Sequence, residues 1–396
     1  MKTVAYSEVQ GLTPGWMTLL GGLGALIAIG LGSAWYMEHN GHYVTGMSNQ
    51  VVWGMPHVFA VFLIVAASGA LNVASIGSVF GKTAYKPLAP LSGLLALALL
   101  VGGLMVLVLD LGRPDRLTVA MTHFNFKSIF AWNVILYTGF FAVVAVYLWM
   151  LMDRRMGGWV KPAGFAAFLW RLILTTGTGS IFGFLVARDA YNSAVMAPLF
   201  IAMSFSFGLA IFILVLMAAY RWTDRPLGDG IVRILKNLLG VFIAAVLYFV
   251  AVQHLTNLYI TERHGIEAFI LRDGGIYTFL FWGVQIVLGS LLPMALLFHP
   301  GLSASRANVA LASLLVIVGG LAQVYVIIIG GQAYPLEIFP GMEVVASGFF
   351  DGQVAAYSPT AAETMLGISG FALAMAIVAV GATVLRFLPV SLADEG

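Results

Sequence analysis

The chain has 396 residues, of which 61% are hydrophobic and only 9% are charged. Because soluble domains carry about 25% charged residues, this composition excludes a soluble globular protein and predicts a polytopic membrane protein. The net charge of +2 is spread thinly and gives no basis for nucleic-acid binding, and the absence of cysteine excludes disulfides, thiolate-bound iron–sulfur clusters and cysteine-attached haem in this chain.

Ten apolar stretches are long enough to cross a lipid bilayer as helices, since one crossing needs about 20 residues. Tryptophan and tyrosine gather at their ends, which is typical of the membrane–water interface. The first stretch follows a polar segment without a cleavage site, so we expect it to be kept as a span. The sequence predicts an all-α membrane protein with a single integral domain and spans at residues 16–36, 52–77, 88–109, 129–152, 170–188, 197–220, 234–258, 275–298, 308–329 and 364–386.

The distribution of basic residues predicts the orientation of the spans. Thirteen of the 19 Lys and Arg residues fall on the side that holds both termini. Since basic residues are enriched in cytoplasmic segments, we predict that both termini lie in the cytoplasm (N-in, C-in). The longest connection, the periplasmic loop at residues 330–363, is then either a docking surface or a solvated cap, and its acidic residues are Glu337, Glu343, Asp351 and Glu363.

A weak internal repeat suggests two related halves. The stretches WNVILYTG from Trp132 and WGVQIVLG from Trp282 share a Trp and a Gly seven residues apart. Membrane proteins built from parallel repeats show such internal similarity. We therefore predict two four-helix bundles (helices 2–5 and helices 6–9) at residues 52–188 and 197–329, with a last helix and tail at residues 364–396.

Ionisable side chains within the spans lie near their predicted outer ends. His57 is about 9 Å inside the second span, and Asp110 ends the third. Such groups are costly in lipid and mark functional sites by default. Because Gly112 permits a sharp turn and Pro114 stops the helix, we expect Arg113 to fold back toward Asp110 or His57.

The chemistry of these side chains leaves several interpretations open. Asp110 is either a proton acceptor beside a bound quinol or one half of an interfacial ion pair. His57 is a hydrogen-bond partner of a quinone that exchanges protons near neutral pH, a haem ligand, or a structural histidine. Only His57 and His254 are expected well inside the membrane, so a two-haem arrangement is not easily built, whereas one haem b stays open.

Three residues at the outer start of the fourth span are further candidates. Trp132 is either an interfacial residue or a surface on which a ring stacks. Asn133 must find hydrogen-bond partners if it is buried. Tyr137 lies one turn deeper, where its hydroxyl can donate to a quinone oxygen.

In the second half, position alone marks His254, Tyr259 and Glu262 as candidates. Arg171 is expected at the inner end of the fifth span, with its head group extended toward water. The inner half of the membrane contains almost no carboxylate or histidine, so the sequence predicts no continuous protonatable path across it.

Three motifs resemble those of a known family. The stretches VVWGMPHVF at 51–59, LDLGRPDR at 109–116 and FAWN at 130–133 are similar to motifs of the NrfD/PsrC family of quinone-interacting membrane subunits. Residues 46–81 look most like the DsrP branch, which belongs to the DsrMKJOP complexes of sulfur-metabolising bacteria. The resemblance covers most of the chain and is strongest over residues 46–133.

This resemblance implies a place in the bacterial inner membrane and a menaquinone or ubiquinone site near the periplasmic face. It also implies a periplasmic ferredoxin-like partner with [4Fe–4S] clusters, together with a multihaem cytochrome c and further membrane subunits as candidate partners. In the family most members carry no metal of their own. The family's His and Asp near the quinone match His57 and Asp110 by motif.

The leading hypothesis is therefore a quinone-reactive subunit of a respiratory or sulfur-metabolising oxidoreductase complex. In it, Asp110 and His57 exchange the quinol protons, Arg113 tunes Asp110, and the head group is bound by Trp132, Asn133 and Tyr137. Two alternatives belong to other classes. One is a secondary transporter with a polar site on the outer side, and the other is a structural membrane anchor.

Overall fold

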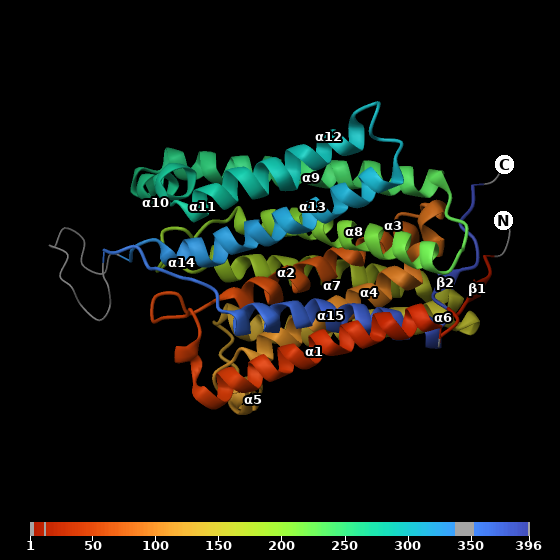
Figure 1. Cartoon of the computed structure of the whole chain (residues 1–396), viewed down its shortest axis with the longest axis horizontal. Coiled ribbons are helices and arrows are strands. Elements are labelled where there is room, and N and C mark those ends of the chain that lie inside the picture. Colours follow the sequence, from red (N-terminus) through yellow and green to blue (C-terminus); the bar gives the residue numbers. More distant parts are fainter. Residues whose placement is uncertain (1–3, 12, 337–351, 395–396) are drawn as a thin grey trace.

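Ten helical spans dominate the structure, a computed structural model that describes residues 4–11, 13–336 and 352–394. They run side by side along one axis, as Figure 1 shows. Each is long and apolar enough to cross a membrane, which confirms the predicted all-α membrane architecture. Three of the acidic loop residues, Glu337, Glu343 and Asp351, lie outside the described residues.

The spans of the first half are mostly single helices. They are α1 (Pro14–Asn40), α2 (Met55–Ala70) continued by α3 (Asn72–Ser78), α4 (Ala89–Leu109), α6 (Ile129–Met152) and α7 (Val160–Gly183). Short helices connect or extend them, namely η1 (His42–Val44), η2 (Thr83–Leu88), η3 (Pro114–Arg116), α5 (Leu117–Thr122) and η4 (Arg154–Trp159).

Two spans of the second half change their helical winding along their length. One joins α11 (Ile276–Phe279), the π-helical η7 (Leu280–Leu291) and α12 (Leu292–Phe298). The other joins α13 (Arg306–Tyr325), the π-helical η8 (Val326–Gly330) and α14 (Gly331–Ala333). The remaining elements are α8 (Met196–Trp222), α9 (Asp229–Tyr259), η5 (Thr261–Arg263), α10 (His264–Ala268), η6 (Phe269–Asp273) and α15 (Ala361–Val384).

Both termini lie at the same end of the helices. Strand β1 (Tyr6–Ser7) pairs antiparallel with β2 (Leu388–Pro389), and Arg225 donates to the Leu388 carbonyl at 3.2 Å and to Ser7 Oγ at 2.9 Å. This agrees with ten spans, because an even number returns the chain to its starting side. We call the opposite end, where α2 begins and α4 ends, the far end (Figure 1). That this end faces the periplasm stays a prediction.

Helix α2 is the central helix, with residues 58–70 all buried. Glycines let its backbone touch that of α8. A Cβ atom added at Gly208 would clash with the Ala70 backbone nitrogen, and one added at Gly69 would clash with the Ser204 carbonyl oxygen. Small residues allow such close crossing between membrane helices, where packing rather than the hydrophobic effect drives association.

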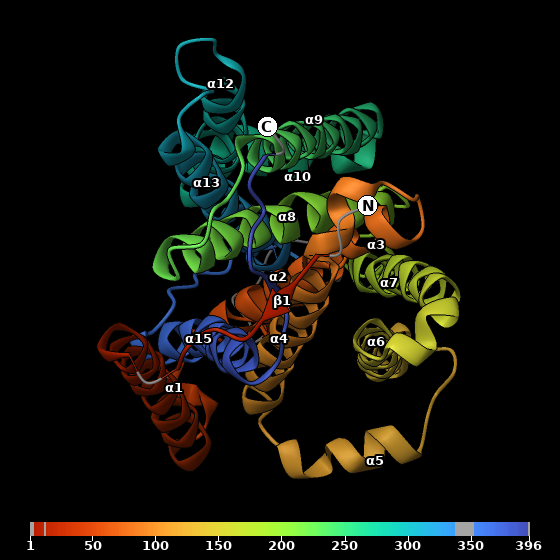
Figure 2. The ribbon, with the colours of Figure 1, turned by 90° about the vertical axis from the view of Figure 1, so that its right-hand side faces the viewer.

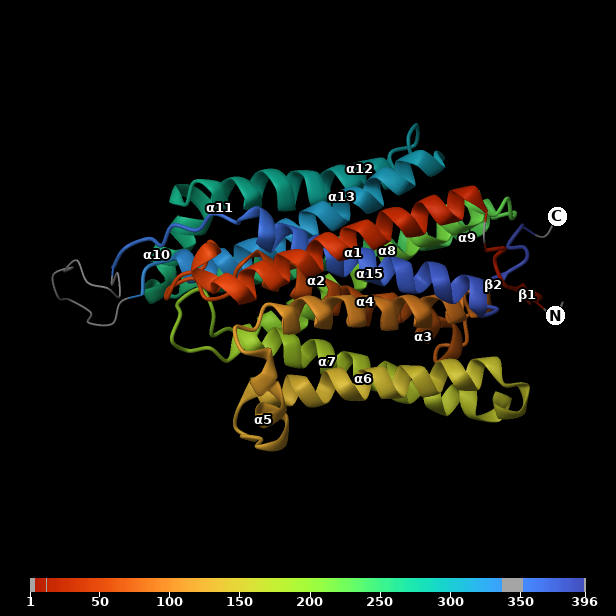
Figure 3. The same cartoon turned by 60° about the horizontal axis from the view of Figure 1, so that its bottom comes forward.

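The other helices surround this centre in layers. Figure 2 shows α9, α12 and α13 on one side of α8, and the α6–α7 pair on the other, with α15 beside α4 and α1 against α15. The small helix α5 lies beside the far end of α6 (Figure 3). Helices α2 and α4 pack directly against each other, so the start of α2 and the end of α4 meet at the far end.

Candidate functional site

A histidine and a carboxylate meet where α2 begins and α4 ends. His57 Nδ1 lies 2.7 Å from Asp110 Oδ2, and the Asp110 side chain is 0% exposed while that of His57 is 17% exposed. Pro56 lies in the first turn of α2, where its missing backbone N–H breaks no helical hydrogen bond. His57 follows it in the same turn. Asp110 Oδ1 is buried and has no hydrogen-bond partner among the described residues. A buried carboxylate with a free oxygen is costly, so this pair is more than an ordinary helix end.

Aromatic rings surround the histidine. The Trp53 ring stacks on the His57 ring, with centroids 6.1 Å apart and planes 26° apart. Phe130 at the start of α6 and Phe182 near the end of α7 approach Trp53 with centroid distances of 5.9 and 6.0 Å. Flat apolar rings beside a partly exposed imidazole can bind a planar ring that carries polar oxygens.

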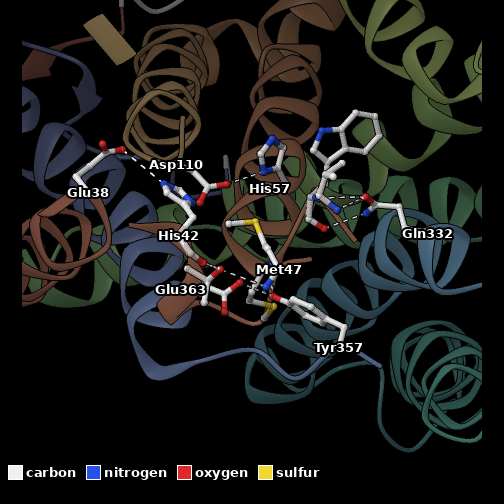
Figure 4. Close-up of polar contacts among 12 residues, drawn as sticks. Glu38, His42, Met47, His57, Asp110, Gln332, Tyr357 and Glu363 are labelled. Atoms are coloured by element: carbon white, nitrogen blue, oxygen red, sulfur yellow. Dashed lines mark hydrogen bonds and ion pairs between the residues drawn. The ribbon is translucent and has the colours of Figure 1, made fainter. Parts of the chain in front are cut away.

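The segment before α2 is held by side chains from distant parts of the sequence. Gln332 Oε1 accepts hydrogen bonds from the backbone N–H groups of Val52 and Trp53 at 2.9 and 3.0 Å. Its Nε2 donates to the Trp53 carbonyl at 3.0 Å, which Figure 4 shows at the right. Arg188 in turn donates to the carbonyl oxygens of Gln332 and Gln50, both at 2.7 Å. Hydrogen bonds at Gln50, Val52 and Trp53 therefore hold the segment that positions the Trp53 ring.

Glu363 fixes the same segment from the other side (Figure 4). Its carboxylate accepts hydrogen bonds from the Gly46 N–H at 2.9 Å, the Tyr357 hydroxyl at 2.8 Å and the Thr360 N–H at 2.8 Å. The Tyr357 hydroxyl also accepts from the Met55 N–H at 2.6 Å. Glu363 is buried and caps the start of α15. This acidic residue of the loop is therefore not available to contact a docking partner.

A second histidine–carboxylate pair lies in the other half of the protein. His254 Nδ1 on α9 is 2.6 Å from Glu267 Oε2 on α10. Asn257 donates to Glu267 Oε1 at 2.7 Å, and Arg263 donates to Asn257 Oδ1 at 2.8 Å. The carboxylate is thus well satisfied, in contrast to that of Asp110.

A small cavity adjoins this second pair. Its volume is about 60 Å³, and mostly apolar side chains line it, with a few polar groups from α9, α10, η7 and α13 among them. The amide nitrogens of Gln253 and Gln323 are buried there without a hydrogen-bond partner among the described residues. Since one water needs about 10–15 Å³ of such volume, the cavity has room for a few waters and not for a quinone ring.

Comparison with known proteins decides the family. The family model described as "Polysulphide reductase, NrfD" matches residues 43–335 of the chain. The chain belongs to the NrfD family. It is an NrfD-like, multi-pass membrane subunit of the kind found in quinol and quinone oxidoreductase complexes.

Several curated relatives match most of the chain. An integral membrane subunit of an Hdr-like menaquinol oxidoreductase from Archaeoglobus fulgidus is 26% identical over 99% of the chain and 98% of the relative. A membrane subunit of a putative dimethyl sulfoxide reductase from Halobacterium salinarum is 29% identical over 97% and 93%. A polysulfide reductase chain from Wolinella succinogenes is 27% identical over 72% of the present sequence and 96% of its own length.

In this NrfD protein, Arg113 does not fold back toward Asp110 or His57, and that expectation was wrong. Its guanidinium pairs with Asp115, with Nη2 2.9 Å from Oδ2, and both side chains are well exposed. The hydrogen bond from Arg113 holds the pKa of Asp115 below its usual range. The short helix η3, which begins at Pro114, places Asp115 within reach, and an exposed pair avoids the cost of burying a guanidinium.

The three candidates on α6 have different surroundings. The Trp132 ring is exposed, and its Nε1 donates to the Phe126 carbonyl at 2.9 Å. Asn133 is buried, and its Nδ2 donates to the carbonyl oxygens of Ile129 and Gly177 at 2.9 and 3.1 Å. Both amide hydrogens are therefore used, and Asn133 ties α6 to α7. Tyr137 is buried beside Thr178 of α7, one turn further in.

The structure separates the three candidates in the second half. Tyr259 is 90% exposed, and Glu262 lies exposed in η5. The residue beside His254 is Glu267, because α9 ends at Tyr259 and the turn η5 reverses the chain, so that α10 packs back on α9.

Arg171 does not extend to water at the inner end of its span. Helix α7 begins at Val160, ten residues before the predicted start at 170, so Arg171 lies in mid-helix and is buried. Its Nη2 donates to Asn72 Oδ1 at 2.8 Å, and its guanidinium lies 5.0 Å and 4.9 Å from the centroids of the Phe168 and Phe205 rings. The aromatic rings and the amide replace part of the water around the cation.

No group of three or more His, Asp or Glu side chains among the described residues is arranged to hold a metal ion. Sequence reasoning missed Trp53, Gln332 and Glu267 as parts of the polar centres. Trp53 stands in the same motif as His57, just before the first residue of α2, and this closeness in sequence is the signal that could have indicated it. For Gln332 and Glu267 the sequence holds no such signal.

Proposed function

We propose that the chain binds a quinone or quinol against the rings of Trp53 and His57 at the far end, and that His57 and Asp110 exchange the protons of its redox reaction. The observation that carries this proposal is the buried pair of His57 and Asp110, in which one carboxylate oxygen lacks a partner among the described residues. An ionisable pair at the membrane edge is a functional site by default. The quinone-interacting character of the family supports the choice of ligand.

The two side chains divide the proton chemistry between them. Because His57 Nδ1 faces Asp110, Nε2 is the ring nitrogen left to meet a hydroxyl or carbonyl of the head group. The imidazole can take a proton from a quinol hydroxyl while the neighbouring carboxylate stabilises the resulting cation. The same groups work in reverse when a quinone is reduced. A quinol loses a pair of electrons together with a pair of protons, so both kinds of transfer must be provided for.

The residues on α6 act indirectly in this proposal. Asn133 and Tyr137 hold α6 against α7 and so position Phe130 beside Trp53, while Trp132 anchors the start of α6 at the interface. Arg113 has no role at the site, because its partner is Asp115.

We further propose that a partner subunit with [4Fe–4S] clusters docks at the far end, which then faces the periplasm, and exchanges electrons with the bound quinol. The names of the relatives support this, since they are subunits of reductase and oxidoreductase complexes. The menaquinol oxidoreductase subunit favours menaquinol as the substrate. The resemblance of residues 46–81 to DsrP, with the polysulfide reductase relative, favours a role in sulfur metabolism.

The test uses the intact complex with its redox partner. Asp110→Asn keeps the shape of the side chain and removes its charge, and His57→Ala removes the imidazole. We expect each to lower the quinol-dependent reduction of the partner's clusters by at least about 100-fold, with assembly unchanged. Asp115→Asn changes an exposed carboxylate on the next turn and serves as the matched control.

The outcomes separate the competing hypotheses. Wild-type rates in both Asp110→Asn and His57→Ala refute the site and favour a structural anchor or a transporter. A haem b band in the absorption spectrum of the purified subunit that disappears in His57→Ala makes this histidine a haem ligand instead. Loss of electron transfer without any haem band supports the quinone site.

A further inference from the structure

The carboxylate of Asp110 has no direct access to water, although the proposed reaction gives it protons to release. Its side chain is fully buried, and among the described residues its ion-pair partner is His57. His57 in turn faces the proposed quinone, so a proton that reaches Asp110 must leave through another neighbouring group. Asp110 Oδ1 has no hydrogen-bond partner among the described residues, so the carboxylate can still accept one more hydrogen bond.

Figure 4 shows a second histidine near Asp110. The ring of His42, from the short helix η1, lies between the carboxylates of Asp110 and Glu38. His42 Nε2 is 3.6 Å from Glu38 Oε1 on α1. A Cβ atom added at Gly112, two residues after Asp110, would lie 3.8 and 3.9 Å from His42 Cδ2 and Nε2, so the imidazole lies against the turn that follows Asp110.

The exposure of these side chains increases outward from the site. The exposed fraction is 0% for Asp110, 26% for His42 and 31% for Glu38. His42 Nε2 is buried and has no hydrogen-bond partner among the described residues, and its one ion-pair contact there is the 3.6 Å approach to Glu38 Oε1. An imidazole can accept a proton on one ring nitrogen and release one from the other. Because no ion pair joins His42 to Asp110 among the described residues, a proton passes between them through one bridging water.

Other charged groups near this histidine are compatible with such a role. Arg113 lies close enough to Glu38 for that carboxylate to add to the rise in the Arg113 pKa, which the hydrogen bond to Asp115 mainly causes. His39, on the same helix turn as Glu38, stacks on Trp35 instead.

We propose that His42 and Glu38 form the proton-exchange route between Asp110 and the aqueous surface at the far end. This inference rests on the proposed quinone function and adds the residues through which its protons pass. The two residues lie before position 43, where the match to the family model begins, so α1 and η1 supply this route from outside the matched region. His42 and Glu38 act through Asp110 and do not touch the quinone.

The test compares His42→Gln and Glu38→Gln with wild type in the intact complex, and His39→Gln is the matched control. We expect His42→Gln to lower kcat for quinol oxidation by at least about 10-fold with KM unchanged, because proton removal and not binding is slowed. Added imidazole should restore part of the rate. Glu38→Gln should shift the pH profile of kcat, and His39→Gln should leave rate and profile as in wild type.

The result that overturns the proposal is a wild-type kcat and pH profile in His42→Gln while Asp110→Asn is inactive, since protons then leave Asp110 by another route. A wild-type rate in Asp110→Asn itself refutes the quinone function and this inference with it. If His42→Gln fails to assemble, Glu38→Gln decides alone, and an unchanged pH profile in that variant overturns the route.

Discussion

At the residue scale, Trp53 determines the shape of the proposed site. Its ring stacks on His57, while Gln332 holds its backbone on both the N–H and the carbonyl side. A large flat ring loses little conformational entropy on binding and offers a broad contact surface. The contribution of Trp53 should therefore be to binding, whereas that of His57 and Asp110 is to proton transfer.

We predict that Trp53→Leu raises KM for a short-chain quinol by about 10-fold with little change in kcat, because loss of a stacking contact costs about 1 kcal/mol or more in both the ground and the transition state. Steady-state kinetics of the intact complex measures both constants. Trp35→Leu, which removes an exposed ring on α1, is the control. A fall in kcat with unchanged KM would contradict a binding role for Trp53.

The sequence predicted single residues better than their partners. His57, Asp110 and His254 each stand out because ionisable groups are costly in lipid, and this rule needs no structure. The partner of His254 depends on the turn after α9, which brings Glu267 rather than Glu262 to the imidazole. Turn geometry of this kind is not encoded in hydrophobic pattern, so the choice between two nearby carboxylates could not be made from the sequence.

At the element scale, α7 carries a cation through the middle of its span. Arg171 makes one hydrogen bond to Asn72 and lies over two phenyl rings, and its Nε and Nη1 have no partner among the described residues. A charge at the centre of a helical span costs about 2.5–3.5 kcal/mol on insertion scales. Cation–π contacts return about 2 kcal/mol when they are desolvated. The cation–π contacts therefore offset only part of the cost of placing the Arg171 charge within the span.

We predict that Arg171→Met leaves the thermal midpoint of the protein in detergent equal to or above that of wild type, because methionine keeps the volume and removes the buried charge. Arg171→Ala should lower it, since the cavity costs about 2–4 kcal/mol. Thermal unfolding of the two variants measures the difference. If Arg171→Met were as destabilised as Arg171→Ala, the charge itself would be shown to stabilise the bundle.

Helix α7 also shows that hydropathy predicts the number of spans better than their first residues. Among the described residues, ten helices are long and apolar enough to cross a membrane, which is the number that the sequence predicted. The start of the fifth was placed ten residues late, because Lys161, Pro162 and Gly164 make the first turns of α7 look like a loop. A proline in the first turn does not interrupt a helix. This shift alone moved Arg171 from the expected interface to the middle of the span.

At the scale of the whole molecule, the two histidine–carboxylate pairs whose carboxylate is buried, among the described residues, lie in different layers. His57 and Asp110 join α2 to α4, whereas His254 and Glu267 join α9 to α10 on the other side of α8 (Figures 1 and 2). Their positions do not follow the weak internal repeat, because the first histidine begins a span and the second lies near the end of one. The division into two four-helix bundles stays a prediction, and α8 packs against helices of both groups.

We predict that Glu267→Gln keeps quinol-linked electron transfer within about twofold of wild type, whereas Asp110→Asn abolishes it. The cavity beside Glu267 measures about 60 Å³, far below the roughly 300 Å³ or more of pockets that hold organic ligands. Glutamine can still accept the hydrogen bond from Asn257, so the turn should keep its structure. The measurement is quinol-dependent reduction of the partner's clusters at equal amounts of assembled complex.

The pair of variants locates the reaction within the molecule. Loss of activity in Asp110→Asn alone assigns the quinone chemistry to the α2–α4 pair and leaves the cavity at His254 as a hydrated structural feature. Equal loss in Glu267→Gln would contradict the one-site interpretation, because the well-satisfied carboxylate at α10 would then have to take part in the reaction from the opposite side of α8. Among the described residues, the two carboxylates differ in whether an oxygen is left without a partner, and this difference is the physical reason to expect activity to depend on Asp110.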